Sequence, residues 1–209
     1  QETSTGIRLI KWSLIGYLIS TFGLWALGPV TAMLGRVHEL YFMTIQWFLH
    51  FQLNGWFVLG TLGLLVFFAE KRGNKVLISG IYEVILLGSV LLTYALAITW
   101  AEPSPVFFWI NSVAVLLQGV VYYLLLSKIW PVIRTLKLNP FVRQMLHLAL
   151  ISLVAKAFLQ ILLVLPEVAV ISYTIRMYVI GFLHLVLLGA MSFGLVGLAM
   201  ADGRIQLSY

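Results

Sequence analysis

Long apolar segments separated by short polar connections make up most of the chain. Each segment is about 20 residues or longer, the length that an α-helix needs to cross the hydrocarbon core of a bilayer. Prolines lie at several of the segment ends, where a missing backbone N–H costs little. We therefore expect an all-α fold, a six-helix transmembrane bundle in one domain over residues 1–209, with helices at residues 9–34, 40–69, 76–100, 105–131, 141–165 and 175–201.

The composition agrees with a polytopic membrane protein whose main surroundings are the lipid bilayer. Hydrophobic residues make up 62% of the chain and charged residues 10%, whereas soluble domains carry roughly 25% charged residues. The chain has no cysteine, which excludes disulfides, thiolate metal sites and a cysteine nucleophile. Its net charge of +6 includes no basic run longer than Lys71-Arg72, so no nucleic-acid partner is expected.

The positive residues predict the orientation of the helices. Loops that stay in the cytoplasm are enriched in Lys and Arg. In the expected topology only Arg36 and Arg176 fall on one side of the membrane. Ten fall on the other side, namely Arg8, Lys11, Lys71, Arg72, Lys75, Lys128, Arg134, Lys137, Arg143 and Arg204. This bias predicts a multi-pass protein of a bacterial-type inner membrane with both chain ends in the cytoplasm.

Ionisable residues inside the apolar segments are candidates for function, because such groups are costly in a bilayer. At a rise of about 1.5 Å per residue, His50, Lys156 and His184 each lie roughly 12–15 Å from the same membrane boundary. Three helices are thus expected to bring ionisable groups to one level in the outer half of the membrane. Glu83 lies near the cytoplasmic boundary, where Lys71 or Lys75 is its expected partner.

Polar residues recur at helical spacing in three of the segments, which places each set on one helix face. The sets are Gln46, His50 and Asn54; Asn111, Gln118 and Tyr122; and Ser152, Lys156 and Gln160. All three faces should turn inward, since lipid offers them no hydrogen bonds. They are either ordinary hydrogen-bonding contacts between helices, worth about 0.6 kcal/mol each, or the lining of a site. Lys156 in particular needs a partner for its ammonium group.

His50 and His184 form the sharpest candidate pair. A neutral imidazole is a good ligand for haem iron, copper or zinc. Two histidines at one depth on different helices could hold haem b between them, or ligate copper. Gly55, Gly181 and Gly189 would let a flat ring, or equally a neighbouring helix, approach closely. The alternative is that each histidine is buried separately and satisfied by a neighbour.

Two segments around these histidines resemble the His-bearing helices of the haem–copper oxidase superfamily, particularly its remote NnrS-type branch. They are residues 49–57 (LHFQLNGWF) and 181–191 (GFLHLVLLGAM), and in each a glycine follows the histidine by five residues. The chain as a whole resembles the C-terminal half of uncharacterised members. The resemblance implies haem or metal ligation by His50 and His184 and a role in electron transfer or in handling a small gas or copper. Gln46 and Asn54 would then orient an imidazole, and Lys156 with Gln160 would meet a propionate or a bound anion.

Two other functions remain open. The chain could be a non-catalytic structural or assembly subunit of a larger membrane complex, in which the polar faces only join helices. It could also be a small transporter, with Lys156, Gln160, Asn111 and Gln118 along an anion or proton path. Association with another helical membrane subunit or with a second copy is expected, since six helices would leave a ligand site open to lipid. No phosphate loop, GxSxG or HExxH motif occurs, so whether the chain is an enzyme stays open.

Overall fold

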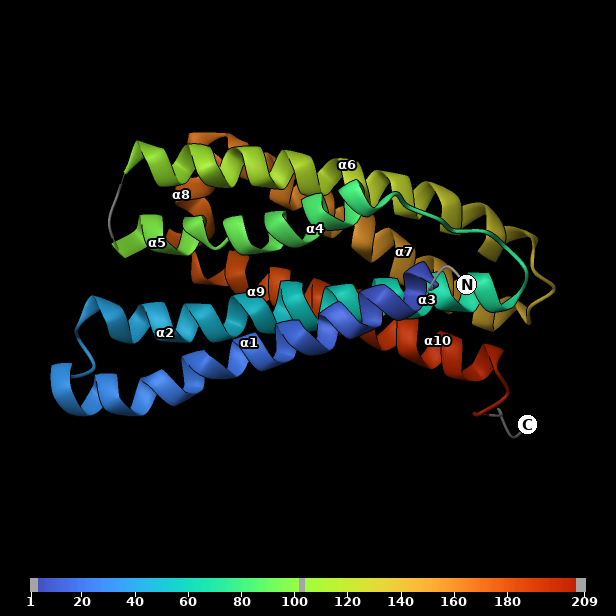
Figure 1. Ribbon diagram of the computed structural model, residues 1–209, viewed down its shortest axis with the longest axis horizontal. Coiled ribbons are helices and arrows are strands. Elements are labelled where there is room, and N and C mark those ends of the chain that lie inside the picture. The colour runs from blue at the N-terminus through green and yellow to red at the C-terminus, as the bar shows by residue number, and fades with distance from the viewer. Residues whose placement is uncertain (1–3, 102–103, 206–209) are drawn as a thin grey trace.

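The computed structural model describes residues 4–101 and 104–205, and in these ranges it contains helices and connecting segments but no β-strand (Figure 1). Most helices join end to end into longer rods, and two eight-residue segments are π-helical. The elements are α1 (Thr5–Leu34), α2 (Glu39–His50), π-helix η1 (Phe51–Val58), α3 (Leu59–Lys71), α4 (Gly80–Leu92), α5 (Ala95–Ala101), α6 (Pro105–Thr135), α7 (Pro140–Ile161), 3₁₀-helix η2 (Leu162–Val164), α8 (Pro166–Thr174), α9 (Arg176–His184), π-helix η3 (Leu185–Ser192) and α10 (Phe193–Ala201).

Six of these rods are long and apolar enough to cross a membrane, which confirms the expected all-α six-helix bundle within the described residues. The third rod differs from the prediction in two ways: residues 76–79 precede the helix, and the helix breaks after Leu92. The fourth rod continues through Pro131 to Thr135 instead of ending at the proline. The expected connection after Leu165 contains the short helix α8.

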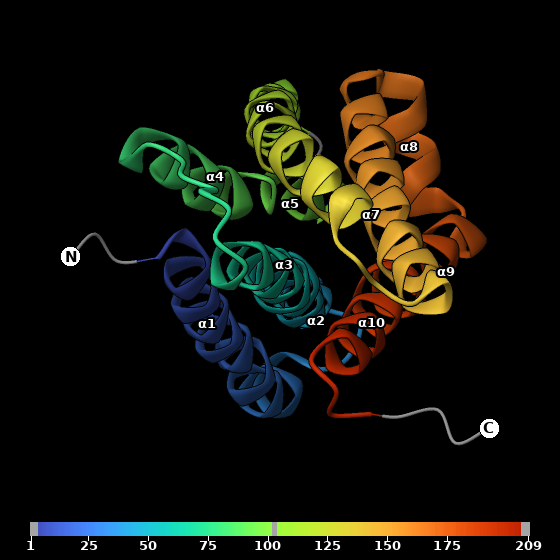
Figure 2. The same ribbon diagram turned by 90° about the vertical axis from the view of Figure 1, so that its right-hand side faces the viewer.

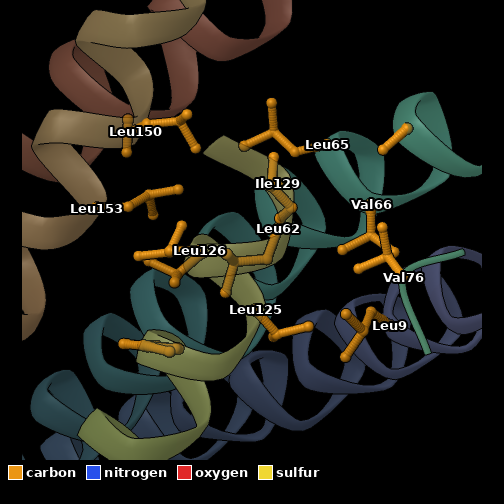
Figure 3. Packing of buried hydrophobic residues seen from close by; sticks show 14 of the residues in the cluster. Leu9, Leu62, Leu65, Val66, Val76, Leu125, Leu126, Ile129, Leu150 and Leu153 are labelled. Carbon is orange, nitrogen blue, oxygen red and sulfur yellow. The ribbon is translucent and has the colours of Figure 1, made fainter. Parts of the chain in front are cut away.

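The rods run along the long axis of the molecule, and α1 begins at the same end at which α10 finishes (Figure 1). We call this end the terminal end, and the end with the α1–α2 connection the distal end. Viewed along the axis, the rod α2–η1–α3 lies between α1 and the remaining helices (Figure 2). Its buried leucines, among them Leu62 and Leu65, pack toward Leu125 and Ile129 of α6 and Leu150 and Leu153 of α7 (Figure 3).

Small residues let α1 pack closely on the central rod. The buried residues of α1 are Thr5, Gly6, Leu9, Ser13, Gly16, Ser20 and Gly23. A Cβ atom on Gly16 would lie 2.6 Å from the backbone carbonyl carbon of Gly55 in η1. Small residues at such crossings are typical of membrane helices, whose association depends on close van der Waals contact. Gly55 therefore lets helix α1 approach closely. The sequence had left open whether this glycine makes room for a flat ring or for a neighbouring helix.

Polar contacts tie the helices together at the terminal end. The carboxylate of Glu70 in α3 accepts hydrogen bonds from the hydroxyl of Ser4 and from the backbone N–H groups of Thr5 and Gly6, at 3.1 and 3.2 Å. These N–H groups have no partner within their own helix. Glu70 thus caps α1 from a neighbouring rod.

Glu83 also makes a contact across the bundle. Its carboxylate accepts from Arg8 Nε and from Trp12 Nε1, both at 2.7 Å. The expected partners Lys71 and Lys75 were wrong, because they were chosen for nearness in sequence. The fold instead brings the first turns of α1 beside α4.

Candidate functional site

A cavity of about 770 Å³ lies in the distal half of the bundle. Its walls come from α2, η1, the α4–α5 junction, α5, α6, α7, η2, α8 and α9, and most of the wall is apolar. Binding sites for small molecules and cofactors have volumes of roughly 300–1,000 Å³ and the same mixture of an apolar wall with a few polar groups. The polar lining residues are Gln46, His50, Asn54, Thr93, Asn111, Gln160, Ser172, Arg176 and Tyr178.

The polar face predicted on the second segment lies on the wall of this cavity. Gln46, His50 and Asn54 all line it, and Asn54 Nδ2 donates to the backbone carbonyl of His50 at 3.3 Å. Gln160 of α7 lies on the same wall. Four of the six residues proposed from the sequence as a site are therefore brought together.

His50 is held by the break between α4 and α5. The backbone N–H of Tyr94 donates to Leu91, so the Val90 carbonyl lacks the usual helical partner four residues later. His50 Nε2 lies 2.8 Å from that carbonyl oxygen. If Nε2 carries the proton and donates it, Nδ1 keeps its lone pair. An N–H bonded to a carbonyl is the arrangement that usually orients a metal-ligating histidine, and it also satisfies a buried structural one.

The amide side chains in and beside the cavity have polar atoms without partners. Among the described residues, the buried atoms without a hydrogen bond include Asn54 Oδ1, both amide atoms of Asn111, both of Gln118 and Gln160 Oε1. Most buried polar atoms in folded proteins are hydrogen-bonded. Three of these residues, Asn54, Asn111 and Gln160, line the cavity, where a polar group could pair with them.

Lys156 is completely buried but does not line the cavity. Its Nζ donates to the hydroxyl of Tyr122 at 3.0 Å and lies 4.7 Å from the centre of the tyrosine ring. Lys156 lies one turn from Gln160 on α7. Its complete burial agrees with the expectation that it faces inward.

The structure does not bring His184 to this site. Its side chain is exposed and its Nδ1 lies 2.7 Å from the carbonyl oxygen of Ile180, on the same helix. Val179, Phe182 and Leu183 take the cavity-facing positions of α9, and His184 follows them on another face of the helix. The two imidazoles expected to enclose one cofactor therefore point to different surroundings.

Each of these histidines is followed directly by a π-helix, a feature that the sequence analysis missed. His50 precedes η1 and His184 precedes η3, and the two π-helices contact each other. π-Helical segments are rare and occur frequently at functional sites. The glycines within them serve packing: Gly55 lies against Gly16, and Gly189 lies against Ser152. The only signal in the sequence was the repeated spacing of five residues from histidine to glycine.

Comparisons with known proteins add no relative. No family model, no curated protein and no solved structure matches this chain.

Proposed function

We propose that this chain is a membrane protein of oxidase-like type that binds haem in the distal cavity, with His50 as its imidazole ligand. It would serve electron transfer or the handling of a small gas. The observation that carries the proposal is the placement of His50: its ring lies on the cavity wall, the Val90 carbonyl fixes one ring nitrogen, and the other nitrogen has no hydrogen bond among the described residues.

The donor set of the cavity fits haem better than copper. Haem iron is held in many proteins by a single imidazole on one side of the ring. Copper sites of the imidazole type gather several ligands. The lining residues include one histidine and no acidic residue, and no cluster of three or more His, Asp or Glu residues occurs in the described part of the chain. We therefore propose haem b as the cofactor, and we do not propose a copper centre formed by this chain alone.

The other polar lining residues have roles that follow from their positions. Asn54 contacts the backbone of His50 and would help to hold the imidazole-bearing turn. Gln46 lies one turn before His50 on the same wall. Arg176, at the start of α9, adds a positive charge to the lining and suits the carboxylates of a haem. The bound haem would supply one-electron redox chemistry.

Optical spectra of the detergent-purified protein test the proposal. We expect a Soret band and a sharp α band after reduction with dithionite, both lost in His50→Gly and restored by added imidazole. His184→Ala is the matched control and should keep the spectrum. A featureless wild-type spectrum would overturn the proposal and favour the structural-subunit alternative, and loss of the bands in His184→Ala alone would move the ligand away from the cavity.

We further propose that both chain ends face the cytoplasm of a bacterial inner membrane. The loops and helix ends of the terminal end carry ten Lys and Arg residues, and the distal end carries two. This asymmetry is what the positive-inside rule associates with cytoplasmic loops.

A second helical chain, either another subunit or a second copy, is proposed to cover α9. The exposed imidazole of His184 supports this, because an ionisable side chain facing lipid is costly. A packed helix on this face would remove His184 from lipid.

A further inference from the structure

Lys156 is a buried lysine whose amino group contacts no acidic side chain in the described part of the chain. Its relative exposure is 0%, and its contacts are the hydroxyl and ring of Tyr122. Buried ammonium groups in proteins are normally paired with an anion. The proposed haem site does not use this residue.

Two contacts between the antiparallel helices α6 and α7 place further polar groups beside Lys156. Tyr122 meets Lys156, and Gly119 faces Ile161. This register brings Gln118 level with Gln160, one turn from the Tyr122–Lys156 pair. We call Gln118, Tyr122, Lys156 and Gln160 the α6–α7 tetrad.

Several polar atoms of the tetrad have no hydrogen-bond partner among the described residues. Gln118 is 1% exposed, and neither atom of its amide has a partner. Gln160 Oε1 is also unpaired, and this residue lines the distal cavity. The Tyr122 oxygen accepts from Lys156, which leaves its own hydrogen available to donate. The tetrad therefore offers an ammonium, a hydroxyl and the Gln118 amide N–H as donors. Gln160 lines the distal cavity, and Tyr122 lines a second pocket on the other side of the tetrad.

We propose that the α6–α7 tetrad binds a carboxylate group that enters from the distal cavity. A carboxylate supplies only acceptors when ionised, so it would pair with the Lys156 ammonium, the Tyr122 hydroxyl and Gln118 Nε2, and the unpaired amide oxygens of Gln118 and Gln160 would face away from it. Charge-assisted hydrogen bonds of this kind are roughly twice as strong as neutral ones. The tetrad shares the distal cavity with the proposed haem site but includes neither His50 nor Arg176, so loss of acetate binding and loss of the haem spectrum are distinguishable results.

The carboxylate has two sources that an experiment can separate. It is either a free small anion or the acidic end of a longer ligand whose apolar part occupies the cavity beside Leu159, Leu163 and Phe182. Acetate probes the carboxylate alone, and hexanoate adds an alkyl chain. Burial of that chain would make hexanoate bind more tightly than acetate, whereas a site for small anions would favour acetate.

Thermal unfolding of the detergent-purified protein provides the test, with acetamide as the neutral analogue of acetate. A ligand that binds the folded state raises the unfolding temperature, and the stabilisation grows with the logarithm of its concentration divided by its Kd. We expect acetate to raise it at constant ionic strength and acetamide to leave it unchanged. Lys156→Met should abolish the acetate effect and Tyr122→Phe should weaken acetate binding about tenfold. Lys137→Met, an exposed lysine outside the tetrad, is the control.

Three results would overturn the proposal: no response of the wild type to either carboxylate, an equal response to acetate and acetamide, or an unchanged response in Lys156→Met. If Lys156→Met does not fold, Tyr122→Phe decides, since it keeps the cation and removes only the hydroxyl. An unaltered acetate response in that variant would then reject the site.

Discussion

Gly16 of α1 and Gly55 of η1 lie so close that a Cβ atom on Gly16 would come within 2.6 Å of the Gly55 carbonyl carbon. The obstacle is backbone, which cannot rotate away as a flexible side chain can. This contact fixes α1 against the rod that carries His50. The close packing of these two backbones therefore helps to hold the wall of the cavity that carries His50.

We predict that Gly16→Ala lowers stability by about 1–3 kcal/mol, the usual range for overpacking a close contact. The matched control is Gly88→Ala in α4, where an added Cβ would meet nothing within 4 Å. That variant should be neutral or slightly more stable, because Ala favours helix over Gly by up to about 1 kcal/mol. Unfolding midpoints of both variants in detergent give the comparison. Equal effects in the two would contradict the packing argument.

Glu70 should stabilise the first turn of α1 from outside the helix. Replacing it with Gln removes the negative charge that faces the free N–H groups of Thr5 and Gly6. We expect a loss of about 1 kcal/mol, the usual value of a helix N-cap. Amide hydrogen exchange at Thr5 and Gly6 should become faster in Glu70→Gln. Glu39→Gln, an exposed glutamate in the first turn of α2, should leave these two amides unchanged.

Single cysteines can establish the orientation directly, since the chain contains none. Val37→Cys lies in the α1–α2 connection with 92% exposure, and Lys137→Cys is exposed in the connection between α6 and α7. A membrane-impermeant maleimide added to intact bacterial spheroplasts should label Val37→Cys only. Lys137→Cys should react after the membrane is opened. The reverse pattern would show that the chain ends face outward.

Of the two chains proposed to cover the face of α9 that carries His184, a second copy can be tested by disulfide cross-linking. Leu188 is 57% exposed and lies one turn beyond His184. Oxidation of Leu188→Cys in native membranes should therefore give a disulfide-linked dimer. Val113→Cys on α6 is similarly exposed, at 54%, and should stay monomeric. A monomeric Leu188→Cys, or equal dimer formation by both variants, would argue against this contact.

The removal of the His50 side chain should also weaken the junction of α4 and α5. The Val90 carbonyl has His50 Nε2 at 2.8 Å and the Thr93 hydroxyl at 3.2 Å as its partners beyond the helix backbone. We expect His50→Phe to lower the free energy of unfolding by about 1–3 kcal/mol, because the buried Val90 carbonyl loses one of its hydrogen bonds. His184→Phe should cost less, because within the described residues its side chain hydrogen-bonds to its own helix alone and its ring is exposed. Detergent unfolding midpoints of the two variants would reveal the difference, and a larger loss in His184→Phe would contradict it.

The sequence by itself determined the six helices and the inward direction of most polar faces. The hydrophobicity of a local segment decides whether it enters a bilayer, so the rods could be located without knowledge of their neighbours. The same reasoning correctly turned Lys156, Gln118, Tyr122 and Asn111 inward, since each is almost fully buried. The regular spacing of polar residues on α6 and α7 allowed these helix faces to be predicted from the sequence.

Only the tertiary structure decided which of the two histidines meets the cavity. His50 and His184 share the same glycine spacing and a following π-helix, and the sequence predicted one depth for both, yet one lines the cavity and the other is exposed. The difference lies in the rotation of each rod about its axis, which depends on contacts with several other helices. The break at Thr93 and the pairing of Glu83 with Arg8 were equally hidden, because both arise between segments far apart in the chain.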